Sequence, residues 1–215
     1  MESVRRNAGG REVIIITDKN VSNYVKFPSW IIKKIDAGII TRTNLSDLLR
    51  LSLLASYGGM WLDSTFYCVG SLDKSLYNGP IFSIKRPDYL HASVAGGMFA
   101  GYSLGCDDDH RRAFATIRDF FLEYWRRNDF MVDYLLVDYL TVLAQRHDPW
   151  IAEAFNEIQP NNPDCDELFK ILDQPYDEDM WKRLSAHTDL FKLTWKQDFP
   201  VEHDGEKHFM ECWKA

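Results

Sequence analysis

The sequence lacks the features that mark several common classes of protein. Its formal net charge of −7 argues against nucleic-acid binding, because that function depends on basic patches. The four cysteines lie far apart without a C-x-x-C pair, so zinc and redox motifs are unsupported, and a disulfide framework is not expected in so long a chain. No uninterrupted apolar run reaches transmembrane length, and the N-terminus lacks the layout of a signal peptide. We therefore expect a soluble, cytoplasmic protein, attached at most peripherally to the inner face of the membrane.

Two familiar nucleotide-binding motifs are also missing. The glycine-rich stretch 94–101, VAGGMFAG, contains neither the G-K-[ST] of a phosphate loop nor the G-x-G-x-x-G of a dinucleotide turn. Its small residues are expected instead to allow close backbone packing beside a cleft. With 215 residues, 46% of them hydrophobic, and no internal repeat or low-complexity linker, the chain is expected to form a single domain, 1–215, with a sizeable core.

The rest of the chain is organised around residues 44–65, which read NLSDLLRLSLLASYGGMWLDST. Leucines on every side of the helical wheel over 45–55 predict a helix buried all round, and Gly58-Gly59 predict its end. Residues 60–69, rich in aromatic and β-branched side chains, predict a strand. Burying a charge is costly unless the charge is paired or bound to a ligand. The candidate functional residues are therefore the three charges inside this apolar stretch: Asp47, Arg50 and Asp63.

Spacing places these charges relative to one another. Asp47 and Arg50 are three residues apart, so they share a helix face and can touch. Asp63 and Thr65 are two apart, so they point to the same side of a strand. Ligands of open α/β sheets bind at the carboxyl ends of strands, where Asp63 is expected. A structural Asp47–Arg50 ion pair with Asp63 capping a turn explains the same residue types, so both interpretations stay open at this point.

Outside this stretch the sequence predicts mostly helices. The expected elements are a helix end within 1–10, a buried strand at 13–17, a helix at 28–37, a strand at 81–84, helices at 107–128 and 130–146, shorter helices at 150–158, 164–173 and 177–186, and a strand at 190–195, followed by a polar surface tail from 197. The run Asp107–Asp109 is interpreted as partners of a helix dipole rather than as metal ligands. Tyr134 and Asp138 are expected on one helix face. Asp138 is the best candidate outside the central stretch, and a satisfied buried acid explains it equally well.

A family resemblance adds to these expectations. The order S-D-x-x-R, apolar residues, G-G, an aromatic, L and D-x-[DT], from Ser46 to Thr65, resembles the donor-binding core of DXD-type glycosyltransferases. The closest likeness is to the capsular polysaccharide synthesis family, which is similar to glycosyltransferases whose sugar-binding region contains the DXD motif. A weaker likeness continues through DYLLVDYL at 133–140 and FKLTWK at 191–196. Because order, spacing and chemistry agree, the resemblance favours the functional interpretation of the buried charges.

The resemblance implies an α/β fold. This is a GT-A-like (Rossmann-like) nucleotide-sugar domain with a mainly parallel central sheet and added C-terminal helices. Its first strand–helix unit has no counterpart here, which affects base recognition. Within the single domain we expect a donor-binding core at 1–70, a helical part that completes the cleft at 71–196, and a tail at 197–215.

The implied activity is that of a hexosyltransferase that retains the anomeric configuration. A sugar moves from a nucleotide sugar, with a UDP-sugar expected, to a glycan or polysaccharide acceptor in capsular or surface polysaccharide synthesis. Other capsule-synthesis proteins are expected partners. Negative charge grows on the departing nucleoside diphosphate, and a divalent cation, Mn²⁺ or Mg²⁺, or lysines would stabilise it. These ions prefer oxygen ligands.

The resemblance also assigns roles to individual residues. Asp63 matches the first acid of the DXD motif and is the expected metal ligand and a catalytic residue. Asp138 is the second catalytic candidate. Thr65 departs from the wider class, which has a second acid there, although the capsular family also tends to show threonine. The expected donor-binding residues are Asp47 and Arg50 on the sugar, Trp61 as the aromatic neighbour, Ser64 and Thr65 in the motif, and Lys192 and Lys196 near the diphosphate.

Two functions of other classes stay open. One is a non-catalytic nucleotide-sugar-binding or regulatory protein derived from the same fold, favoured by Thr65 and the short N-terminal part. The other is a small α/β scaffold whose buried charges are simply paired. In the scaffold, Asp47→Ala would lower stability rather than donor affinity.

Overall fold

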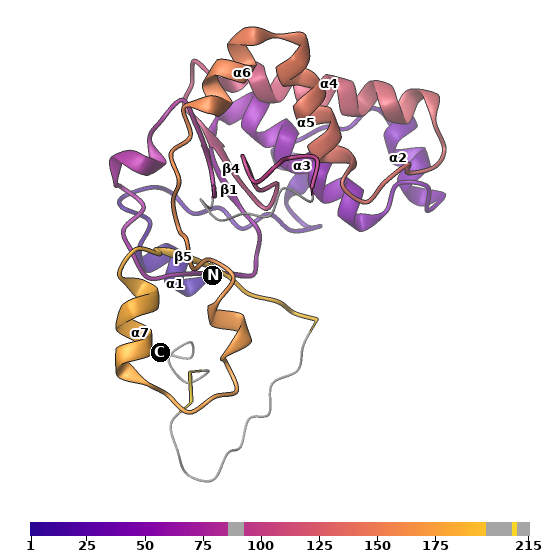
Figure 1. The fold of residues 1–215 in the computed structure, drawn as a ribbon. Coiled ribbons are helices and arrows are strands. Elements are labelled where there is room, and N and C mark those ends of the chain that lie inside the picture. Colours follow the sequence, from indigo (N-terminus) through magenta and orange to yellow (C-terminus); the bar gives the residue numbers. More distant parts are fainter. Residues whose placement is uncertain (86–92, 197–207, 210–215) are drawn as a thin grey trace.

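The computed structural model describes residues 1–85, 93–196 and 208–209. Figure 1 shows helices α2 to α6 gathered with strands β1 and β4 in one part of the molecule, and α1, β5 and α7 in the other. The helices are α1 (Glu2–Arg6), α2 (Ser29–Asp36), α3 (Arg42–Tyr57), α4 (Arg111–Arg127), α5 (Leu136–His147), α6 (Pro149–Asn156) and α7 (Glu178–Ser185), with short 3-10 helices η1 (Val21–Asn23), η2 (Ser75–Tyr77) and η3 (Leu168–Lys170). Across the described ranges, no helix is both long and apolar enough to cross a membrane.

Helix α3 occupies the predicted central position, and its ends have clear local causes. At its start the Thr41 hydroxyl accepts the N–H of Asn44 at 3.3 Å, and the Asn44 side chain accepts the N–H of Thr41 at 3.4 Å. This reciprocal capping satisfies N–H groups that have no partner within the helix. The helix ends at Gly58, whose φ of 64° is open to glycine at little cost. The predicted glycine stop is confirmed.

The expectation that this helix is buried all round is wrong in part. Leu48 and Leu51 are buried, but Leu49 and Leu53 are only half-buried because they line a cleft. The helix therefore has two apolar faces, each with its own environment. One face packs into the core, and the other forms a wall of the cleft.

The sheets correct the predicted fold class. Strands β1 (Gly59–Leu62), β4 (Ser103–Cys106) and β3 (Ile81–Ser83) form one sheet in the order β1-β4-β3, and β2 (Phe66–Cys68) pairs with β5 (Leu190–Lys192) in another. Every pairing between these strands is antiparallel. The protein is thus mixed α/β with small antiparallel sheets, and the expected mainly parallel, Rossmann-like sheet is wrong for the described residues.

The predicted strand over 60–69 shows one reason. A turn at residues 63–65 divides it into β1 and β2, which belong to different sheets. The two halves therefore pair with different strands, β1 with β4 and β2 with β5, and both pairings are antiparallel.

A second correction concerns the strand predicted at 13–17. Residues 11–17 form neither helix nor strand, and Ile14 is 44% exposed. The Ile15 carbonyl accepts a hydrogen bond from the Asn20 side chain at 2.8 Å instead of from a neighbouring strand. Residues 14–16 line the same cleft as α3.

Several other predicted elements are confirmed within a few residues, and three need correction. Helix α4 begins at Arg111 rather than at 107, and α5 begins at Leu136 rather than at 130. Residues 164–173 contain only the short η3. Most of the predicted tail lies outside the described residues. Phe209 within it is 1% exposed and packs on Tyr176 with 5.2 Å between ring centres, so a surface position is wrong there.

The largest core lies where α3 packs on α4, α4 on α5 and α5 on α6. Its largest side chains are fully buried aromatics: Phe114, Phe121, Trp125 and Phe155. Each such side chain stabilises the fold by about 1.5–3 kcal/mol relative to an exposed position. This packing fixes the back of α3, and so the positions of the charged residues on its other face.

Candidate functional site

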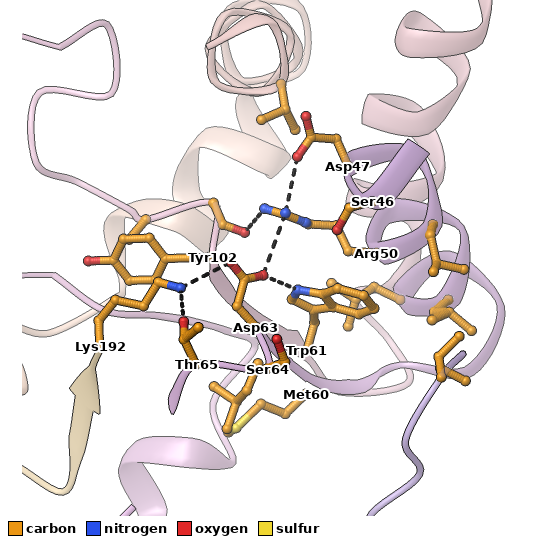
Figure 2. Close-up of a pocket in the computed structure, with 18 of the residues that line it drawn as sticks. Ser46, Asp47, Arg50, Met60, Trp61, Asp63, Ser64, Thr65, Tyr102 and Lys192 are labelled. Carbon is orange, nitrogen blue, oxygen red and sulfur yellow. Dashed lines mark hydrogen bonds and ion pairs between the residues drawn. The ribbon is translucent and has the colours of Figure 1, made fainter. Parts of the chain in front are cut away.

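Asp63 lies in the turn directly after β1, at that strand's carboxyl end. Its backbone N–H donates to the Tyr102 carbonyl at 3.1 Å, and its own carbonyl accepts the N–H of Phe66 at 3.2 Å. These bonds tie the turn to the strands on either side. The side chain accepts the indole N–H of Trp61, with 2.9 Å between Nε1 and Oδ1. Asp63 therefore stands in a fixed orientation, with its carboxylate toward the cleft (Figure 2).

Arg50 connects the helix to this turn. One turn of α3 separates it from Asp47, and its Nη2 lies 3.1 Å from Asp47 Oδ1 and 3.6 Å from Asp63 Oδ1. Its Nη1 donates to the carbonyl of Gly101, and its guanidinium lies 5.7 Å from the centre of the Trp61 ring. Figure 2 shows the guanidinium between the two carboxylates. The predicted contact between Asp47 and Arg50 is confirmed.

The pair is deeply placed, yet it is not fully satisfied. Asp47 is 4% exposed and Arg50 is 7% exposed. The buried Nε of Arg50 has no hydrogen-bond partner among the described residues. A buried donor without a partner costs about 1–3 kcal/mol. Arg50 forms part of the cleft wall, whereas its Nε is shielded from solvent.

Two acids beside Arg50 hold their protons more tightly than usual. Burial raises the pKa of Asp47 to about 6, against the opposing pull of Arg50, and the neighbouring Asp138 and Asp63 raise it further. Burial also raises the pKa of Asp138 to about 6, and Arg50 again opposes the shift. Gly101 is the point where the two side chains meet, because an added Cβ would lie 3.2 Å from Asp138 Oδ1 and 3.3 Å from Arg50 Nη1. The close packing expected near the cleft is found at this glycine.

Lys192 reaches the same turn from β5. Its Nζ lies 3.3 Å from Asp63 Oδ2 and contacts the Thr65 hydroxyl. The rings of Phe66 and Tyr102 lie 5.5 and 5.4 Å from this nitrogen, close enough for a cation–π attraction. Because β2 pairs with β5 so that Phe66 faces Lys192, a sheet holds the lysine across from the D-S-T triplet.

All nine residues chosen from the sequence line one cleft of about 1450 Å³. Asp47, Arg50, Trp61, Asp63, Thr65, Asp138 and Lys192 are buried or half-buried, whereas Ser64 and Lys196 are exposed on its rim. Asp138 comes from the first turn of α5, and Tyr134 lies in the turn before that helix, 62% exposed. The expected helix face shared by these two residues is wrong, although both line the cleft.

Sequence reasoning missed three kinds of wall residue. Tyr102 and Gly101 carry no motif, and they approach Asp63 and Arg50 only through the fold. Tyr24 and Tyr57 form an edge-to-face pair with 6.4 Å between ring centres at another part of the wall. Trp195, 78% exposed, also lines the cleft. Its place between Thr194 and Lys196 in the FKLTWK segment was the one available signal.

The residues around Asp63 do not fit a bound divalent cation. Both carboxylate oxygens already have partners: Oδ1 lies against Trp61 and Arg50, and Oδ2 against Lys192. The Thr65 hydroxyl contacts the same lysine. Within the part of the chain that the structure describes, no group of three or more His, Cys, Asp or Glu side chains could hold a metal ion. The expected Mn²⁺ or Mg²⁺ ligand is thus already bound to cationic side chains.

The acidic run lies apart from the cleft. Asp107 accepts the backbone N–H of His110 at 2.9 Å and contacts its ring nitrogen Nδ1 at 2.6 Å, just before α4 begins. Asp108 lies 3.7 Å from Arg111 Nε. None of these acids lines the cleft. These acids precede α4, which has no acid in its first turn, so the predicted place in the first helical turn is wrong.

Three of the four cysteines lie within the described residues. Cys68, Cys106 and Cys165 are free and buried, and Cys212 lies outside the described residues. Burial raises the pKa of the Cys68 and Cys106 thiols to about 12. Thiols held protonated in this way are poor nucleophiles and poor metal ligands.

Comparison with known proteins identifies the family. No curated protein and no solved structure matches the chain. A family model described as capsular polysaccharide synthesis protein matches residues 1–211. The match includes every residue of the candidate site, from Asp47 to Lys196. With all but the last few residues of its sequence covered, the chain belongs to the capsular polysaccharide synthesis protein family.

Proposed function

We propose that this protein is a glycosyltransferase that moves a sugar from a nucleotide-sugar donor to a glycan or polysaccharide acceptor during capsule synthesis. The observation that carries the proposal is the network of Asp47, Arg50, Asp63 and Lys192 in one large cleft. A purely structural ion pair would not need an open wall, a buried Arg50 Nε without a partner and a second cation at Asp63. Sugars and diphosphates require these acceptors and donors.

The network divides into two ends with different chemistry. At the α3 end, ionised Asp47 accepts hydrogen bonds from sugar hydroxyls while the guanidinium of Arg50 donates to the sugar. At the turn, Asp63 contacts Lys192 and Arg50, and Arg50 shares its charge with Asp47. That end suits the diphosphate. Ser64 and Lys196, exposed on the rim of the cleft, would contact the outer side of the bound nucleotide sugar.

The reaction breaks the bond between the anomeric carbon and the diphosphate oxygen, and the electron pair stays on the diphosphate. The positive charges at the turn stabilise that leaving group as its charge grows. For the configuration to be retained, the acceptor hydroxyl oxygen bonds to the anomeric carbon on the face from which the diphosphate departs, and it gives its proton to Asp138. A carboxylate with a raised pKa is suited to this role, because its proton affinity is closer to neutrality than that of an ordinary aspartate.

The proposal extends to the setting of the enzyme. A UDP-sugar is the proposed donor, and the protein works in the cytoplasm with other capsule-synthesis proteins that supply or extend the acceptor. Retention of the anomeric configuration, which the family resemblance implies, is read directly from the NMR spectrum of the product's anomeric proton.

The test is a panel of nucleotide sugars incubated with the protein and capsular polysaccharide fragments, with release of nucleoside diphosphate as the readout. We expect one donor to give turnover that Asp47→Asn reduces by about tenfold or more, because a charged hydrogen bond to the sugar contributes about 1.5–3 kcal/mol. The control is Lys170→Met, a surface lysine paired with Glu167 outside the cleft. Donor binding by calorimetry without any diphosphate release would instead support the non-catalytic binding protein.

A further inference from the structure

We propose that the ammonium group of Lys192 is the built-in cation that binds the donor diphosphate, in the place where a divalent ion would bridge Asp63 and Thr65. This inference rests on the proposed function and adds the means by which that site holds its leaving group. The ligand it takes is a nucleoside diphosphate, bound without a metal ion.

The first support is position. Figure 2 shows Lys192 Nζ between the side chains of Asp63 and Thr65, in contact with both. The residues that the D-x-T pattern offers to a cation therefore already hold one. An ion bound to Asp63 Oδ2 and to the Thr65 hydroxyl at about 2.0–2.2 Å would overlap the lysine nitrogen. The two cations exclude each other at this point.

The second support is that the rest of the surroundings are built for an ammonium ion. The rings of Phe66 and Tyr102 lie near Nζ at cation–π distance. Aromatic faces stabilise an ammonium group, whereas Mg²⁺ and Mn²⁺ require oxygen ligands. Asp63 Oδ1 is turned away toward Trp61 and Arg50. A metal ion at this point would therefore lack the second carboxylate oxygen, and aromatic rings would lie where it needs further oxygen ligands.

The third support is rigidity combined with access. The backbone of β5 is fixed on both sides of the lysine: the Lys192 N–H donates to the Cys165 carbonyl at 2.8 Å, and the Leu193 N–H donates to the Thr65 carbonyl at 3.0 Å. The Lys192 side chain is nevertheless 21% exposed, and it lines the cleft. The ammonium group is held in place yet open to a phosphate oxygen on one side.

This arrangement also explains the threonine of the motif. A hydroxyl at Thr65 gives the ammonium group a neutral acceptor, so Asp63 is the one carboxylate paired with Lys192. An acid at Thr65 would cancel the positive charge that the turn offers to the diphosphate. A threonine at position 65, where the wider class has a second acid, is therefore expected if Lys192 replaces the metal ion.

The experiment measures the affinity of the whole protein for UDP by calorimetry, once with Mn²⁺ and once with EDTA. We expect the two dissociation constants to agree within about twofold. Lys192→Met should weaken UDP binding by about tenfold or more in both buffers, because one charge-assisted hydrogen bond is worth about 1.5–3 kcal/mol. Lys170→Met serves as the matched control and should bind UDP as the original protein does. Lys192→Gln, which keeps a polar contact with Thr65, provides a second neutral variant, and circular dichroism checks that each variant is folded.

The outcomes separate this inference from the function beneath it. UDP binding that EDTA abolishes, or that Mn²⁺ strengthens more than about fivefold, would overturn the role of Lys192 while leaving a nucleotide-sugar site in place. Undiminished UDP binding by folded Lys192→Met and Lys192→Gln would overturn it as well. If neither UDP, GDP nor CDP binds the original protein in either buffer, the proposed function and this inference both fail.

Discussion

Arg50 is the residue on which the site depends, because it joins α3 to the turn that carries Asp63. Its guanidinium contacts Asp47, Asp63 and the Gly101 carbonyl, and the residue forms part of the cleft wall. A planar group with five donors can make all these contacts at once, whereas an ammonium group cannot. The identity of this cation matters more than its charge.

Replacing it with lysine separates these two properties. Arg50→Lys keeps the charge and removes the forked geometry, so we expect donor affinity to fall by about tenfold or more through loss of the guanidinium's hydrogen bonds to the sugar. Stability should fall by about 1–3 kcal/mol, since the Gly101 carbonyl and one acid lose their partner. Calorimetric titration with the donor and urea unfolding measure the two effects. Unchanged donor affinity in the folded variant would remove Arg50 from the binding site.

The raised pKa of Asp138 predicts a pH dependence of activity. If Asp138 must be ionised to take the acceptor proton, turnover should rise as the pH increases through about 6 and level off above it. Asp138→Asn should lower turnover by about 100-fold or more and leave no rise that depends on this group. A pH–rate profile of both proteins is the measurement, and a variant that keeps the original turnover across this range would contradict the role of Asp138, whereas the pKa of Asp47, also about 6, can preserve part of the pH dependence.

The same shift affects stability in the opposite sense. The pKa of Asp138 rises from 3.8 to about 6 on folding, so the folded state binds its proton more tightly than the unfolded state does. The free energy of unfolding should therefore decrease as the pH rises from about 4 to 6 and stay level above. Asp138→Asn should make that decrease smaller. Urea unfolding at a series of pH values measures it, and an unchanged slope would contradict the raised pKa.

The sequence predicted the residues of the site better than their contacts. Spacing along one helix was enough to place Arg50 beside Asp47. The contact between Lys192 and Asp63 joins residues far apart in the chain, and no local pattern specifies it. Gly101 and Tyr102 act through their backbone carbonyls. Every residue has a carbonyl, so the sequence gives no signal for such a role.

At the scale of elements, the junction between α3 and β1 positions the site. Gly58 closes the helix with φ 64° and ψ −146°, a combination that side chains with a Cβ almost never adopt. An added Cβ would also lie 3.2 Å from the Cys106 carbonyl on the neighbouring strand. The strand that leads to Asp63 can therefore begin directly after the helix that carries Arg50.

Gly58→Ala tests this junction. We expect the free energy of unfolding to fall by about 1–3 kcal/mol, because alanine would have to hold a strained conformation. Thermal unfolding is the measurement. Gly79→Ala is the matched control, since its backbone is not in the left-handed region and an added Cβ would approach only to 3.9 Å from the Ile81 carbonyl. Equal stability of the two variants would show that the junction carries no strain.

Elements were predicted well where capping or glycine chemistry is local, as at the ends of α3, and poorly where tertiary structure decides. The apolar run at 13–17 has the composition of a buried strand, but its side chains line the cleft and it pairs with no strand of the described structure. The stretch before α5 has apolar residues at helical spacing, yet Phe130 and Val132 are exposed in a loop. A continuous apolar run cannot show whether a core or a ligand site covers it. The antiparallel pairing could not be read from the sequence. The three-residue turn that divides β1 from β2 lies inside one continuous run of strand-like residues, and each strand pairs with a partner far away in the chain.

At the scale of the whole molecule, the acidic run lies apart from the cleft. Replacing Asp107, Asp108 and Asp109 together with Asn should leave donor binding within about twofold of the original, because none of them lines the cleft and Asp107 and Asp108 pair with His110 and Arg111. Calorimetry with the donor measures this. A large loss of affinity in a variant that is still folded would show that the acidic run belongs to the site after all.

The central claim is that one cleft holds the sugar at Arg50 and Asp47 and the diphosphate at Lys192. The most direct measurement compares two affinities in each variant: that of the donor found in the nucleotide-sugar panel and that of its free nucleoside diphosphate. The account predicts that Arg50→Lys weakens the donor by about tenfold while the free nucleotide changes by less than about twofold, and that Lys192→Met weakens both ligands. Equal losses for the two ligands in both variants, or no loss in either, would contradict this division of the site.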